Sequence, residues 1–95
     1  MRNIAFPALL ALSLISSCAQ MPASSTVVKG AGPDDLLKLR AGPGLGYKVI
    51  VGLPDGTRLT RGACVTEVGQ LWCHVTLTAS PHVKGYVSAD YLSAN

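Results

Sequence analysis

The chain has 95 residues, with eight Lys and Arg against five Asp and Glu, and 48% of its residues are apolar. This length allows one small domain and excludes the large enzyme folds. The charges are scattered along the chain without a basic cluster, so the sequence does not indicate nucleic-acid binding. Much of the apolar content lies in the first 17 residues, which points to a targeting segment rather than to the core of a domain.

The N-terminal segment has the organisation of a secretory signal. Residues 1–3 carry one positive side chain, and the apolar stretch that follows over residues 4–15 is too short to cross a bilayer comfortably. The next segment, Leu14-Ile15-Ser16-Ser17-Cys18, resembles the lipobox of bacterial lipoproteins. The resemblance implies that residues 1–17 are removed and that Cys18 becomes the acylated first residue of the mature chain. The alternative is an ordinary signal peptide that is cut near residues 19–23.

The lipid at Cys18 also predicts the location of the protein. Several acyl chains hold a protein stably at a membrane surface, whereas a single chain does not. Ala19 follows the cysteine, in place of the aspartate that the lipoprotein sorting rule associates with the inner membrane. We therefore expect an exported protein that is anchored to the bacterial outer membrane and faces the periplasm.

Two cysteines remain once Cys18 is assigned to the lipid. Cys64 and Cys73 are nine positions apart in a chain that we expect to reach an oxidising compartment, and this predicts a disulfide between them. A loop of this size contributes about 2.5–3 kcal/mol to stability in the chain-entropy model. The alternative is a metal site that also uses His74 and His82, but the spacing matches no usual zinc pattern. We expect neither a metal nor another cofactor.

The mature chain divides into a linker and a domain. Residues 18–33 contain the lipid site and then a stretch rich in Ala, Ser, Gly and Pro without periodicity, which predicts a flexible linker that holds the domain off the membrane. Over residues 34–95, short apolar runs alternate with turn residues. The pattern predicts strands at 37–40, 47–53, 57–64, 71–77 and 83–88, followed by a single helical turn at 89–92. Five short strands at this spacing indicate a small antiparallel barrel or sandwich.

Five short motifs of the domain resemble bacterial SH3-like (SH3b) domains and occur in the order found in that family. They are LKLRAGPG at 37–44, YKVI at 47–50, LPDGT at 53–57, WCHV at 72–75 and GYVSADYL at 85–92. The resemblance implies an all-β fold, a small five-stranded SH3-like antiparallel barrel. Tyr86 stands where the family usually has tryptophan, and this departure concerns ligand preference more than fold.

The aromatic side chains are candidates for a binding site. The mature chain has four, Tyr47, Trp72, Tyr86 and Tyr91. If they lie on one side of the barrel they form a shallow peptide groove; the alternative is that two or three of them fill the core. Trp72 and Cys73 point to opposite faces of one strand, which predicts that the indole is partly exposed. Arg40, with Lys38, is a candidate to attract a carboxylate, although charges on an alternating strand are usually only its solvated face.

Catalysis has little support in the sequence. Both cysteines of the domain are assigned to a disulfide, which leaves no free thiol nucleophile, and His74 and His82 are the only histidine bases. The motifs Ser-x-x-Lys and Gly-x-Ser-x-Gly do not occur. We therefore expect a noncatalytic protein.

The SH3b resemblance implies a binding function. It implies that the domain, displayed on a lipid anchor in the envelope, binds peptidoglycan stem peptides or a peptide segment of a partner protein. A second hypothesis is an accessory or inhibitory lipoprotein that acts on an envelope enzyme or a secretion component. A third is a stress-related surface protein whose domain has no specific ligand. The sequence does not rank the first two, because small barrels carry many ligands on the same frame.

Overall fold

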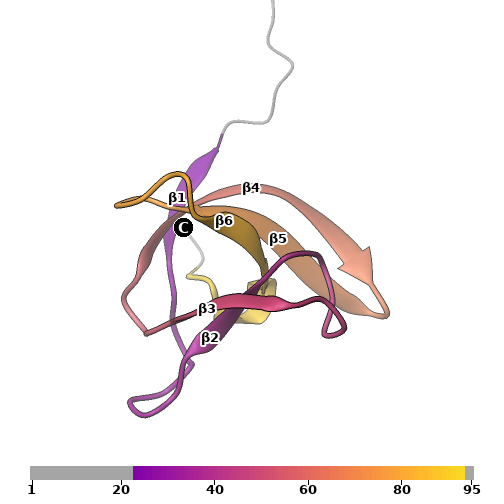
Figure 1. Cartoon of the computed structure of the whole chain (residues 1–95), viewed down its shortest axis with the longest axis horizontal. Helices are drawn as coiled ribbons and strands as arrows, with labels where there is room; N and C mark the ends of the chain where they lie inside the picture. Colours follow the sequence, from indigo (N-terminus) through magenta and orange to yellow (C-terminus); the bar gives the residue numbers. More distant parts are fainter. Residues whose placement is uncertain (1–22, 94–95) are drawn as a thin grey trace, which may run out of the picture.

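Six strands and one short helix follow each other in the part of the chain that the computed structural model describes, residues 23–93 (Figure 1). The elements are β1 (Ser24–Val27), β2 (Leu37–Arg40), β3 (Val49–Leu53), β4 (Arg58–Glu67), β5 (Gln70–Leu77), β6 (Lys84–Ser88) and the 3-10 helix η1 (Ala89–Tyr91). All strand pairs are antiparallel, and the sheet has the order β1-β4-β5-β6-β2-β3. This confirms the all-β, SH3-like antiparallel fold expected from the sequence. The expected signal peptide, residues 1–17, and the expected lipid site at Cys18 lie outside the described residues.

The strands form where apolar and polar residues alternate, and they end at residues suited to turns. In β2, Leu37 and Leu39 are buried while Lys38 between them is exposed, as the two-residue period of a strand requires. The turn between β4 and β5 consists of Val68 and Gly69, both with positive φ, at 50° and 76°. Two such residues are the signature of the tight hairpin turn whose twist matches that of the flanking strands.

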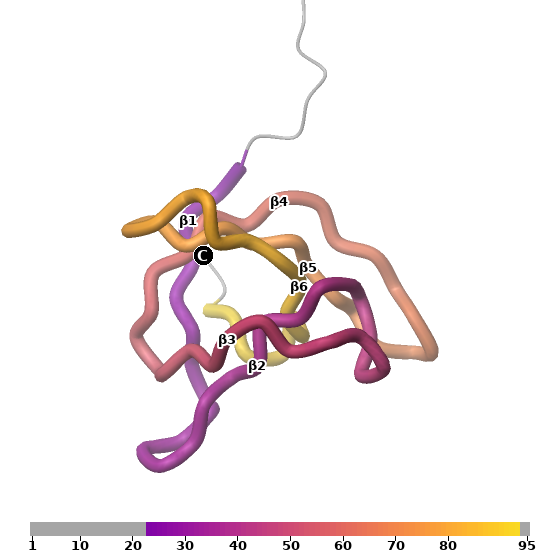
Figure 2. Tube along the Cα trace, viewed as in Figure 1, coloured from indigo at the N-terminus to yellow at the C-terminus, as the bar shows by residue number. Residues whose placement is uncertain are grey.

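The sheet curls on itself, as the ribbon and the tube both show (Figures 1 and 2), and it encloses one apolar core. The core consists of Val28, Leu37, Leu39, Leu53, Leu59, Cys73, Val75, Val87 and Leu92. These residues come from five of the six strands and from the segments that follow β1 and η1. Between residues 23 and 93, no helix is long and apolar enough to cross a membrane.

A disulfide joins Cys64 to Cys73, as expected from the sequence. The two residues are directly opposite each other on β4 and β5. Cys73 is almost fully buried in the core, and Cys64 packs against it. The disulfide therefore ties the longest hairpin of the sheet to the core, close to the point where the ladder between Arg61 and Cys64 is irregular.

We expected a flexible linker over residues 18–33, and this prediction is wrong from Ser24 onward. β1 pairs with β4 along its whole length, and Val28, which follows it, is only 1% exposed. On the other side of β1, the Thr26 hydroxyl donates to the Ser93 carbonyl at 3.0 Å, and the Ser93 amide donates to the Val27 carbonyl at 2.9 Å. β1 is therefore a sixth strand in addition to the five expected, held between β4 and the end of the described chain.

We expect the substitution Val28→Ala to lower the free energy of unfolding by about 2 kcal/mol, because it removes two methyl groups from a filled core. The measurement is urea denaturation of the chain from residue 19 onward, which contains every element described above. The matched control is Val51→Ala, since Val51 is exposed on β3, and this change should stay within about 0.5 kcal/mol. Equal effects of the two substitutions would contradict the placement of residues 24–28 in the fold.

Candidate ligand groove

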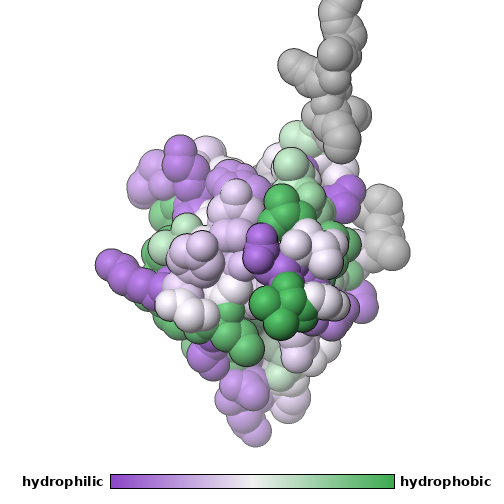
Figure 3. All heavy atoms as spheres, turned by 90° about the vertical axis from the view of Figure 1, so that its right-hand side faces the viewer, coloured by the Kyte–Doolittle hydropathy of each residue, from purple (hydrophilic) through white to green (hydrophobic). Residues whose placement is uncertain are grey.

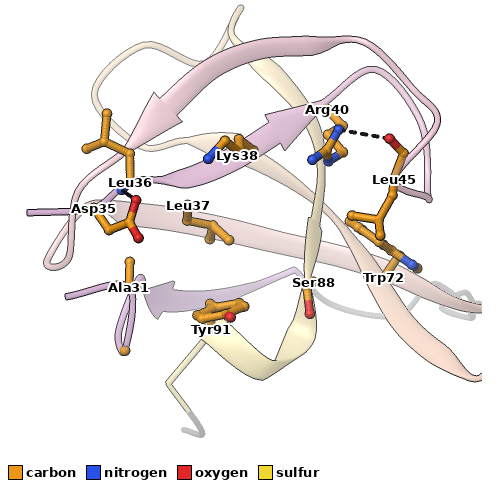
Figure 4. Close-up of a pocket in the computed structure, with 11 residues that line it drawn as sticks. Ala31, Asp35, Leu36, Leu37, Lys38, Arg40, Leu45, Trp72, Ser88 and Tyr91 are labelled. Carbon is orange, nitrogen blue, oxygen red and sulfur yellow. Dashed lines mark hydrogen bonds between the residues drawn. The ribbon is translucent and has the colours of Figure 1, made fainter.

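The loop between β2 and β3 lies beside the turn between β4 and β5, on the right of Figures 1 and 2. Two adjoining pockets, of about 250 and 730 Å³, extend from this place to η1. They share the four lining residues Leu45, Trp72, Ser88 and Tyr91. We treat the two pockets together as one groove, whose smaller part is shown in Figure 4.

Arg40 holds the loop that forms one wall of the groove. Its Nη1 atom donates to the carbonyl oxygens of Leu45 and Tyr47, both at 3.1 Å, and the first of these bonds is drawn in Figure 4. The Tyr47 ring lies against the loop, because a methyl group placed on Gly42 would collide with it. A guanidinium group with several donors in a fixed fork is well suited to gather carbonyl groups in this way. The loop therefore has a defined shape before any ligand binds.

The position of Arg40 depends in turn on a glycine in β6. Arg40 pairs with Tyr86, the residue after Gly85. A Cβ atom on Gly85 would overlap the carbonyl oxygen of Arg40 and would lie 3.1 Å from the Leu39 side chain. The missing side chain of Gly85 is thus what allows the backbone of β2 to approach β6.

Three of the aromatic residues expected in a binding site are brought together. Tyr47 lines the larger part of the groove, and Trp72 and Tyr91 line both parts. Trp72 does lie on the face of β5 opposite Cys73, but its expected partial exposure is wrong, since only 5% of it is exposed. The sequence predicted that Trp72 and Cys73 lie on opposite faces of β5; it did not show that the β2–β3 loop and η1 meet at the same point of this strand.

Tyr86 lies apart from these three residues. It is half-buried on β6, lines neither part of the groove, and its ring meets the His74 ring edge-on with 5.2 Å between centroids. Arg40 does line the smaller part of the groove. Arg40 also positions the β2–β3 loop through its hydrogen bonds to the Leu45 and Tyr47 carbonyls. The alternation of residues along the strand did not predict this second role.

Two exposed apolar residues of the groove were missed by sequence reasoning. Leu45, at the tip of the β2–β3 loop, is 77% exposed, and Val68, in the β4–β5 turn, is fully exposed. Valine is a β-branched residue that rarely adopts positive φ, and Val68 has φ of 50°. An apolar residue between two glycines was a signal for Leu45. Val68 had a weaker signal, since it directly precedes Gly69 between two of the expected strands.

Polar side chains connect the floor of the groove to η1. The Gln70 amide Nε2 donates to the Ser88 hydroxyl at 2.8 Å and to the Asp90 carboxylate at 3.4 Å. Ser88 caps η1 by accepting from the Asp90 amide. These bonds position Tyr91, the aromatic residue at the end of the helix. The groove thus combines apolar walls with a few placed polar groups, the usual composition of a ligand site.

Hydrophilic and hydrophobic residues are mixed on this end of the molecule, which faces the viewer in Figure 3. The smaller part of the groove contains two cations, Lys38 and Arg40, and one anion, Asp35. The described residues that line the larger part include two anions, Glu67 and Asp90, and no cation. Within residues 23–93, no group of three His, Cys, Asp or Glu side chains is arranged to hold a metal ion.

Comparison with known proteins places this architecture in a family. The family model described as bacterial SH3 domain matches residues 35–93, more than half of the chain. The chain belongs to the bacterial SH3 domain family. In this SH3 domain, β1 precedes the matched residues, so the strand nearest to the expected lipid site is an addition to the part that matches. No curated protein and no solved structure matches the chain.

We expect Gly85→Ala to lower the free energy of unfolding by about 2–3 kcal/mol, because the added methyl group forces β2 away from β6. The control is Gly46→Ala in the β2–β3 loop, where a methyl group would meet nothing within 4 Å. That change should leave stability within about 0.5 kcal/mol of the wild type. Urea denaturation measures both variants. An unchanged free energy of unfolding in Gly85→Ala would show that the pairing of β2 with β6 does not require a glycine at this position.

Proposed function

We propose that this bacterial SH3 domain is a noncatalytic, lipid-anchored protein of the outer membrane, facing the periplasm, that binds peptidoglycan stem peptides in the groove. Membership of the family suggests a peptidoglycan-binding or peptide-binding role. The groove is open along one side of the domain and is bordered by Tyr47 and Tyr91, so it suits an extended peptide better than a compact molecule.

The observation that carries the proposal is that Val68 combines an exposed side chain with a positive φ. Its side chain is fully exposed, so it contributes no burial to the fold, and its backbone lies in the left-handed region. That conformation costs roughly 1–2 kcal/mol for a residue other than glycine. A valine that weakens the fold and borders a groove is explained if its methyl groups contact a ligand. Leu45, 77% exposed on the opposite wall, supports the same explanation.

A lipid on Cys18 keeps the start of β1 close to the membrane. From Cys18 to the start of β1 at Ser24 the chain advances six residues, which span at most about 20 Å when fully extended. Because β1 belongs to the folded sheet, the domain cannot move farther from a lipid on Cys18 than this short segment allows. We infer that the protein acts on wall material near the membrane surface.

We expect Val68→Asn to stabilise the domain and to weaken its binding to the wall. Asparagine tolerates positive φ, and Asn-Gly is a preferred pair for this hairpin turn, so stability should rise by about 1 kcal/mol. The same change removes an apolar contact from the groove. The measurements are urea denaturation and co-sedimentation of residues 19–95 with purified sacculi at low and moderate salt.

The control for this experiment is Ile50→Ala, which shortens an exposed apolar residue that lines neither part of the groove. It should leave sedimentation unchanged. Wild-type protein that stays in the supernatant would refute wall binding and would favour a protein partner. Wild-type pelleting that Val68→Asn leaves unchanged would place the wall-binding surface outside the groove.

We expect Cys18→Ser to abolish lipid labelling and to release the protein from the membrane fraction, because a thioether to lipid requires the thiol. The measurement is incorporation of labelled palmitate, followed by fractionation of the cells. The double variant Cys64→Ser/Cys73→Ser is the matched control, since it removes the disulfide cysteines and should keep the label. Label retained by Cys18→Ser would show that the anchor is elsewhere or absent.

A further inference from the structure

The groove has opposite charges in its two parts. In the smaller part, Lys38 and Arg40 lie along one rim on β2, opposite Ser88 and Tyr91 (Figure 4). In the larger part, the carboxylates of Glu67 and Asp90 are the charged groups. The shared residues, Trp72 among them, lie between the two. A ligand that occupies both parts therefore meets a positive region and a negative region in a defined order.

The positive region has one cation without a hydrogen-bond or ion-pair partner among residues 23–93. The Lys38 ammonium makes no hydrogen bond or ion pair with any residue between 23 and 93, and the side chain is exposed. Arg40 adds positive charge but is engaged with the loop carbonyls. Asp35 also lines this part, and its Oδ1 atom accepts a hydrogen bond from the Leu36 amide. Two cations against one anion leave this part of the groove positive.

The negative region likewise has one anion that forms no hydrogen bond or ion pair within the described part of the chain. Among the described residues, the Glu67 carboxylate has no hydrogen-bond or ion-pair partner. Within residues 23–93, the Asp90 carboxylate accepts only from the Gln70 amide and from no cation. Glu67 stands next to Val68, so the strained turn presents an apolar group and a carboxylate to the same part of the groove.

We propose that the groove selects a peptide with a free primary ammonium, which it places near Glu67 and Asp90, and a free carboxylate, which it places near Lys38. This inference rests on the proposed function, since it names the form of stem peptide that is bound. A cross-link between stem peptides is an amide, which consumes the ammonium of one stem and a carboxyl group of another. The groove should therefore prefer stems that are not cross-linked.

The test uses residues 19–95 and a synthetic tetrapeptide of stem type, acetyl-L-Ala-γ-D-Glu-L-Lys-D-Ala, with the glutamate α-carboxylate amidated. This peptide has one ammonium, on the lysine, and one carboxylate, at the C-terminus. A second form has the lysine amine acetylated, and a third has the C-terminus amidated. Binding is measured by NMR titration, and the emission of Trp72, the single tryptophan of the chain, gives a second readout.

Each blocked form should bind the wild type about fivefold more weakly, the effect of losing one solvent-exposed ion pair worth about 1 kcal/mol. In Glu67→Gln the penalty for acetylation should fall, while the penalty for amidation remains. In Lys38→Met the opposite should hold. The controls are Asp34→Asn and Lys48→Met, which remove one exposed charge of each sign outside the groove and should keep both penalties.

The outcomes separate this inference from the proposed function. Equal binding of the three peptides, or penalties that the groove variants do not change, would overturn the charge selection and leave wall binding intact. Sacculi that retain the protein while no peptide binds would also overturn it, because the retained ligand would then be another part of the wall. If neither sacculi nor peptides bind, the proposed function fails and this inference fails with it.

Discussion

The close approach of β2 and β6 at Gly85 is the contact on which the rest of the structure depends. Four strands, β1, β4, β5 and β6, pair in an unbroken series, and within residues 23–93 the strand pairing that joins β2 and β3 to them is that of Arg40 with Tyr86. The same Arg40 directs its guanidinium group to the β2–β3 loop. One missing side chain thus closes the sheet over the core and also places the wall of the groove.

A small core needs additional constraints, and this domain has two. The Cys64–Cys73 disulfide ties the long hairpin of β4 and β5 to the core. β1 joins the two ends of the described chain, because it pairs with β4 on one side and is hydrogen-bonded to Ser93 on the other. Both constraints lower the freedom of the hairpin and of η1, which together contribute Val68, Trp72 and Tyr91 to the lining of the groove.

Stability and binding place opposite demands on the walls of the groove. Leu45 and Val68 expose apolar surface that the core does not use, and Val68 does so from an unfavourable backbone conformation. Lys38 and Glu67 carry charges for which the fold supplies no partner among the described residues. Features that weaken a fold without a compensating contact are expected where a ligand supplies that contact.

The sequence by itself determined the order of five strands, the position of the turns and the disulfide. These follow from local rules, because alternation in β2, the turn residues within LPDGT at 53–57 and the pair of cysteines nine positions apart each act over a few residues. The family resemblance of 37–92 added the way in which these strands are joined.

Only the tertiary structure decided that residues 24–27 form a strand, that Trp72 is buried and which residues line the groove. Ser-Ser-Thr-Val has no strand pattern of its own, and its hydrogen bonds come from residues more than 30 positions away. The groove likewise unites a loop, a turn and a helix that are distant in the chain. Such contacts exist only after the chain has closed on itself, so no window of local sequence contains them.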